Sequence, residues 1–158
     1  MSRKGIFSGV DRYAVLDSIR TTIAAVSAMV LARLIRLPEY YWASISTIVV
    51  VQSTIPPRTL GWQRFVGTAM GAVLGAAVAT FFHAGAAVYA VGIFLCGLLA
   101  FFFRVGGAYR FAAITLSLVL LIPRASGPWI TAWHRFLEVS LGIAVALVVT
   151  TLWPLKRN

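Results

Sequence analysis

The sequence predicts an all-α transmembrane protein, a six-helix bundle made of two inverted three-helix repeats. Three observations predict it: the composition, six apolar segments and a residue match between the two halves. Of the 158 residues, 60% are hydrophobic and 11% are charged, and the mean hydropathy is +0.89. Soluble domains carry about 25% charged residues. This composition cannot cover a water-facing surface, which excludes an ordinary soluble protein.

Six apolar segments divide the chain, and a membrane-spanning helix needs about 20 mainly apolar residues. The predicted spans are residues 13–35, 40–54, 62–82, 85–103, 108–122 and 133–153. The second and the fifth are short. The connections are brief and carry Gly, Pro or Arg, which leaves no room for a soluble domain. We therefore expect a single integral membrane domain over residues 1–158, embedded in the lipid bilayer.

The basic residues predict an orientation. The chain has 14 Lys+Arg and 4 Asp+Glu, which gives a formal net charge of +10. The basic residues stand singly between apolar runs, so they form no patch of the kind that binds nucleic acid. With the amino terminus inside, more Lys and Arg lie at the cytoplasmic face than at the outer face, which is the usual bias. The sequence therefore predicts that both termini are cytoplasmic.

The two halves share residues at constant offsets. At an offset of 68, Arg36, Tyr41, Thr47 and Val51 match Arg104, Tyr109, Thr115 and Val119. At an offset of 71, Arg64, Phe65, Gly71 and Thr80 match Arg135, Phe136, Gly142 and Thr151. Repeats of three spans would cross the membrane in opposite directions, as in many transporters. The alternative is that apolar helices share such residues by chance.

The matched short spans, residues 40–54 and 108–122, point to a transport site. Short or interrupted helices in corresponding positions of two halves often form such a site. The alternative is that these helices are only tilted differently, or are longer than their apolar stretch.

Arg20 lies about two turns inside the first span, roughly 10 Å along the helix axis. A charge at that depth is costly and usually faces a cavity or a partner. Asp17 is three residues earlier, on the same helix face. Two interpretations remain open. Arg20 forms an ion pair with Asp17 or reaches the lipid phosphates, or it belongs to a cationic ring that lines an anion path.

Arg64 and Arg135 are predicted to begin the third and sixth spans. Helix N-termini attract anions, and an Arg there would strengthen that field; the alternative is simple anchoring at the interface. Glu138 follows Arg135 by three residues, so a local ion pair is expected. Asp17 and Glu138 are the acidic residues inside the predicted spans, which makes them the candidates for ion pairing or for coupling to protons.

Small residues and aromatic residues mark two further patterns. Gly67, Gly71 and Gly75 recur every fourth residue, a spacing that lets helix backbones approach closely; the partner helix could lie in this chain or in another. Aromatic residues gather at the predicted outer interface, as in aromatic belts. These are Tyr40, Tyr41, Trp42, Trp129 and Trp133. Alternatively, they form a vestibule that stacks planar substrates.

Enzymatic chemistry has little support in the sequence. His83 and His134 stand alone at span ends, and Cys96 is the single cysteine, so we expect no metal site. No nucleophile with a neighbouring base and no phosphate-binding glycine loop is found, so we expect no cofactor and no catalytic residues.

Several segments of the chain resemble a known family. They are residues 19–25, 37–38, 41–45, 52–54, 63–71, 135–137, 141–143 and 153–154, of which the Arg-x-x-Gly-Thr-x-x-Gly stretch from Arg64 to Gly71 is the most specific. Together they resemble the membrane domain of the fusaric acid resistance-like, or aromatic acid exporter, family. The membrane domain of plant aluminium-activated malate channels is similar.

The resemblance implies a six-helix unit of a bacterial inner membrane that exports aromatic or other organic anions from the cytoplasm. Proteins of the family often carry two such units, which implies a homodimer here. The candidate residues for the pore or the substrate are Arg20, Tyr41, Trp42, Gln52, Arg64 and Arg135. The competing hypothesis is a non-transporting membrane scaffold or accessory subunit.

Overall fold

The computed structural model describes residues 10–122 and 126–155, and this part of the chain forms six α-helices and no strand. The helices are α1 (Val10–Leu34), α2 (Tyr41–Val51), α3 (Pro57–Phe81), α4 (Ala86–Phe102), α5 (Tyr109–Leu121) and α6 (Pro128–Leu152). A single 3₁₀ turn, η2 (Gly106–Ala108), leads into α5. The all-α prediction is confirmed.

Three helices are long and apolar enough to cross a membrane: α1 from Arg12 onward, α3 and α6. A helix of 25 residues, such as α3 or α6, is about 38 Å long at 1.5 Å per residue. The hydrocarbon core of a bilayer is about 30 Å thick. The helices α2, α4 and α5 have 11, 17 and 13 residues. The chain is thus an all-α membrane protein with three long and three shorter helices.

Two helices begin several residues before the predicted third and sixth spans. The helix α3 begins at Pro57 and α6 at Pro128, because proline fits the first helical position, where no backbone donor is needed. Arg64 and Arg135 therefore lie seven residues inside their helices, about 10 Å from the first residue. Neither arginine begins its helix. The field of a helix end falls off within the first turn, so it does not add to the attraction of an anion at either arginine.

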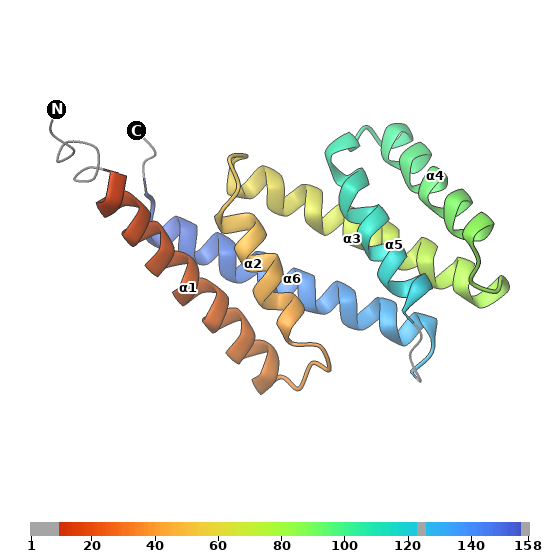
Figure 1. The fold of residues 1–158 in the computed structure, drawn as a ribbon, viewed down its shortest axis with the longest axis horizontal. Helices are drawn as coiled ribbons and strands as arrows, with labels where there is room; N and C mark the ends of the chain where they lie inside the picture. Colours follow the sequence, from red (N-terminus) through yellow and green to blue (C-terminus); the bar gives the residue numbers. More distant parts are fainter. Residues whose placement is uncertain (1–9, 123–125, 156–158) are drawn as a thin grey trace, which may run out of the picture.

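The two long helices α3 and α6 run side by side through the middle of the molecule (Figure 1). The helices α1 and α2 lie on one side of this pair, and α4 and α5 lie on the other. Each short middle helix packs on a long helix of the other half of the chain: α2 packs on α6, and α5 packs on α3. The start of α1, the end of α6 and the α2–α3 connection lie at the same end. We call this the α1-start end, and the other the α1–α2-loop end.

Two turns in the two halves have the same conformation. Arg36 follows α1 with φ 58°, and Arg104 follows α4 with φ 55°. The next residue of each turn donates its backbone N–H to a carbonyl five residues earlier, Leu37 to Ala32 at 3.0 Å and Val105 to Ala100 at 2.9 Å. An inverted repeat would produce matched turns of this kind, and the repeat itself stays a prediction.

The glycine stripe of α3 faces a helix of the same chain. A Cβ atom at Gly71 would overlap the carbonyl oxygen of Ala112, and one at Gly67 would overlap that of Ala108. Gly142 of α6 has a similar contact with Ala43 of α2. The glycines therefore allow α3 to pack closely on α5. They give no support to a contact between two chains, and the homodimer stays a prediction.

Candidate functional site

Three arginines of the described residues are buried inside the helical bundle, one on each long helix. Arg20 of α1 is 7% exposed, Arg64 of α3 is 8% exposed and Arg135 of α6 is 2% exposed. A buried charge is stable only if it is compensated by partners that satisfy its charge and its hydrogen bonds. The three arginines differ in that compensation.

Arg20 forms an ion pair with Asp17. Its Nη2 lies 2.7 Å from Asp17 Oδ1, and its Nη1 donates to the carbonyl oxygen of Trp153 at 3.3 Å. Gln52, at the end of α2, donates from Nε2 to Asp17 Oδ2 at 2.9 Å and to Thr21 Oγ1 at 2.6 Å. The expected pair of Arg20 with Asp17 is formed, and the role of Arg20 in an anion path stays a prediction. This network ties α1 to the ends of α2 and α6.

A cavity of about 340 Å³ opens beside this ion pair, at the α1-start end of the molecule. Asp17 and Arg20 line one side, and Ser53, Thr54 and Pro57 of the α2–α3 connection and the start of α3 line another. Apolar residues such as Val51, Ile55 and Leu155 complete the lining, so the cavity combines an ion pair and hydroxyl groups with apolar surface.

Arg135 is compensated by two carboxylates. Its Nη1 lies 3.1 Å from Glu138 Oε2, and its Nη2 bonds Glu39 Oε2. The guanidinium carbon lies 4.5 Å from the centre of the Trp42 ring, which adds a cation–π contact. Glu39 also donates its backbone N–H to Glu138 Oε1 at 2.9 Å. The expected pair of Arg135 and Glu138 is formed, and the sequence analysis did not find Glu39 as the second partner.

Arg64 has no carboxylate partner within ion-pair distance in the described part of the chain. Its Nε and Nη2 donate to Ser46 Oγ at 3.3 and 3.1 Å. Its guanidinium carbon lies 5.0 Å from the centre of the Phe111 ring, and that of Arg110 lies 4.7 Å from the same ring. Two positive charges therefore share one aromatic ring. An anion beside Arg64 would compensate a charge that this part of the protein leaves unbalanced.

The aromatic residues expected at the outer interface divide into two groups. Trp42 and Tyr41 form one group with Arg135, since both donate to its partner Glu39. Trp129 and Trp133 lie on the other side of α6, since residues 133 and 135 are about 200° apart around the helix axis.

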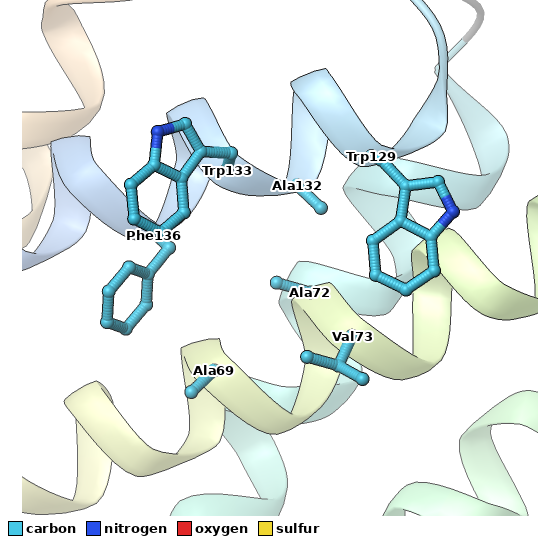
Figure 2. A pocket seen from close by; sticks show the side chains of 7 residues that line it. All are labelled: Ala69, Ala72, Val73, Trp129, Ala132, Trp133 and Phe136. Carbon is cyan, nitrogen blue, oxygen red and sulfur yellow. The ribbon is translucent and has the colours of Figure 1, made fainter.

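With Phe136, these two indoles line an apolar groove of about 240 Å³. Figure 2 shows their side chains on α6 facing those of Ala69 and Val73 on α3. Trp129 and Trp133 are 53% and 59% exposed. Such an apolar, outward-facing groove suits lipid chains.

Sequence reasoning missed four residues of these clusters: Glu39, Ser46, Arg110 and Phe111. For Glu39 a signal existed, because it is one of four acidic residues in the chain and precedes Tyr40, Tyr41 and Trp42. For Ser46 and Phe111 no local signal existed. Among the described residues, no group of three or more His, Cys, Asp and Glu side chains could hold a metal ion.

Comparison with known proteins gives one family. The pattern of the fusaric acid resistance protein-like family matches residues 26–149. The inner membrane protein YeeA of Escherichia coli (strain K12) is similar, with 25% identity over 151 residues, which cover 90% of this chain and 42% of YeeA. The chain thus spans less than half the length of this curated relative. No solved structure matches the chain significantly.

Proposed function

The chain belongs to the fusaric acid resistance protein-like family, and from that premise we propose that it transports small organic anions across a bacterial inner membrane. The substrate class is an aromatic or other carboxylate anion, and the direction is export from the cytoplasm. Membership of a membrane family and three long apolar helices support the membrane part of this proposal.

The observation that carries the proposal is the unbalanced charge of Arg64. A charge inside a bilayer costs a few kcal/mol or more, and Arg20 and Arg135 reduce that cost by pairing with carboxylates. Within the described residues, Arg64 bonds the hydroxyl of Ser46 and contacts the Phe111 ring, which Arg110 also contacts. A bound anion is the partner that this arrangement lacks, and a cation would be repelled.

The route to Arg64 starts at the cavity beside Arg20. Pro57 lines that cavity, and Arg64 lies seven residues further along α3, about 10 Å deeper. The bias of Lys and Arg in the sequence favours a cytoplasmic position for this end. An anion would therefore enter from the cytoplasm and meet Arg64 inside the bundle. In this proposal the pair of Asp17 and Arg20 shapes the entrance.

Flux through liposomes tests the proposal. Purified protein is reconstituted, and efflux of labelled benzoate or malate is measured for the wild type and for Arg64→Ala. The Coulomb energy between an anion and one unpaired positive charge about 4 Å away is about 4 kcal/mol at an effective dielectric of about 20. A difference of about 1.4 kcal/mol changes an equilibrium constant tenfold. We expect Arg64→Ala to lose at least about tenfold in flux. Arg64→Lys should keep part of it, because the charge remains without the planar fork.

The matched control is Arg33→Ala. Arg33 is an exposed arginine that contacts the Tyr40 ring, and its removal should leave the flux unchanged. Equal flux in the wild type and Arg64→Ala, at equal protein, would remove Arg64 from the site. Absence of flux in the wild type for both anions would favour the non-transporting scaffold or accessory subunit.

A further inference from the structure

We infer that Arg135, Trp42 and Tyr41 form a second carboxylate-binding site, which the chain's own Glu39 occupies in this structure. Three donors converge on a single oxygen, Oε2 of Glu39. Trp42 donates from Nε1 at 3.1 Å, Tyr41 donates from its hydroxyl at 2.9 Å, and Arg135 donates from Nη2. Three donors from two helices around one oxygen form a receptor for a carboxylate.

The donors and the occupant differ in how firmly the fold holds them. Tyr41 and Trp42 lie in the first turn of α2, and Arg135 lies on α6 with its side chain 3% exposed. Glu39 belongs to the connection between α1 and α2, and its side chain is 22% exposed. All three donors belong to helices, with Arg135 buried and Tyr41 45% exposed, whereas the carboxylate of Glu39 comes from a connection. A free carboxylate that replaced Glu39 would therefore displace a residue that is not part of a helix.

Arg135 holds an unused donor for a ligand that replaces Glu39. Its Nε is buried and has no hydrogen-bond partner. The Nε–H of a guanidinium lies along the same edge as Nη2, so one carboxylate can accept from both atoms, which is the preferred geometry. A carboxylate that is not tied to the chain could accept from both Nε and Nη2. It would then satisfy a buried polar atom that Glu39 leaves unsatisfied.

The ligand class is a small monocarboxylate. Glu138 bonds Nη1 of Arg135 at 3.1 Å, so the remaining edge accepts one carboxylate group. The rings of Tyr41 and Trp42, with centroids 5.9 Å apart, provide apolar surface beside that edge. The site lies at the α1–α2-loop end, opposite the cavity beside Arg20. That the ligand is the transported anion on its way out rests on the proposed function, whereas carboxylate binding itself does not.

Chemical rescue of Glu39→Ala tests the site. The full-length variant is purified in detergent, and its thermal unfolding midpoint is measured in sodium acetate, with sodium chloride of equal ionic strength as reference. We expect acetate to raise the midpoint of Glu39→Ala by about 5 °C at concentrations far above its dissociation constant. The wild type should respond much less, because tethered Glu39 competes at an effective concentration in the millimolar range or above.

Two further variants make the test specific to the donors. Adding Arg135→Gln to Glu39→Ala should abolish the acetate response. Adding Trp42→Phe, which keeps an aromatic ring and removes the donor, should weaken acetate binding by about tenfold. If Glu39→Ala does not yield folded protein, Glu39→Ser takes its place, since its short side chain also leaves the site open to acetate.

The inference is overturned if acetate has no effect on folded Glu39→Ala or Glu39→Ser, or if the effect persists with Arg135→Gln. Its failure is distinguishable from failure of the proposed function. Liposome flux that depends on Arg64, together with no acetate response, would remove this second site alone. An acetate response without any flux would keep the site and remove the transport.

Discussion

At the scale of single residues, Asp17 and Arg20 form the buried ion pair that anchors α1. Removing one partner of such a pair leaves a charge without compensation, which typically costs about 3–5 kcal/mol. We therefore expect Asp17→Asn to lower the thermal unfolding midpoint strongly. The double variant Asp17→Asn with Arg20→Gln should recover much of the loss, because it removes both charges.

Thermal unfolding in detergent measures both variants, with Thr22→Ala as the matched control on the same helix. Thr22 donates to the carbonyl of Ser18 on the exposed side of α1, so its loss should change stability by less than about 0.5 kcal/mol. A double variant as unstable as Asp17→Asn would contradict the role of this pair.

The same residue scale explains which ion pairs the sequence could predict. Asp17 and Arg20 are three residues apart, as are Arg135 and Glu138, and helix geometry alone places such neighbours on one face. Both pairs are present. Glu39 is 96 residues from Arg135, so no local rule connects them. Only the packing of α2 on α6 brings them together.

At the scale of helices, the contact of α3 with α5 depends on Gly71. A methyl group at this position would overlap the backbone carbonyl of Ala112, and a backbone atom cannot move aside as a side chain can. We expect Gly71→Ala to destabilise the protein by about 1–3 kcal/mol, although alanine favours a helix by about 1 kcal/mol over glycine.

Gly106→Ala is the control for this prediction, because an added Cβ at Gly106 would meet no atom within 4 Å. Unfolding midpoints and the yield of detergent-solubilised protein compare the two variants. Equal stability of Gly71→Ala and Gly106→Ala would contradict close packing of α3 on α5.

Helix boundaries show where a reading by hydropathy is least reliable. The prediction placed the start of the third span at residue 62 and that of the sixth at residue 133, where the continuous apolar run begins. The helices begin at Pro57 and Pro128, because polar first turns and an initial proline are compatible with a helix. This difference matters for function, since it moves Arg64 and Arg135 from helix ends into the bundle.

At the scale of the whole molecule, the two matched turns at Arg36 and Arg104 give a test of topology. If the halves are inverted repeats with the termini in the cytoplasm, the first turn faces the periplasm and the second faces the cytoplasm. A membrane-impermeant maleimide should therefore label Arg36→Cys in intact cells. It should label Arg104→Cys only after the membrane is permeabilised.

Both residues are exposed, and the native Cys96 is buried, so it should contribute little background labelling. Labelling of both variants from the periplasm would contradict the inverted arrangement. The reverse pattern would keep the repeat and reverse the orientation of the chain.

The sequence by itself determined the class of the protein and the local pairs. A composition with 11% charged residues requires a bilayer as solvent, and helical periodicity fixes contacts between residues three or four positions apart. Only the tertiary structure decided which buried arginine lacks a carboxylate among the described residues and which helix the glycines of α3 meet. Those outcomes depend on the packing of α2 on α6 and of α5 on α3. The physical reason is that apolar helices can pack in many ways, whereas neighbours along one helix have a single geometry.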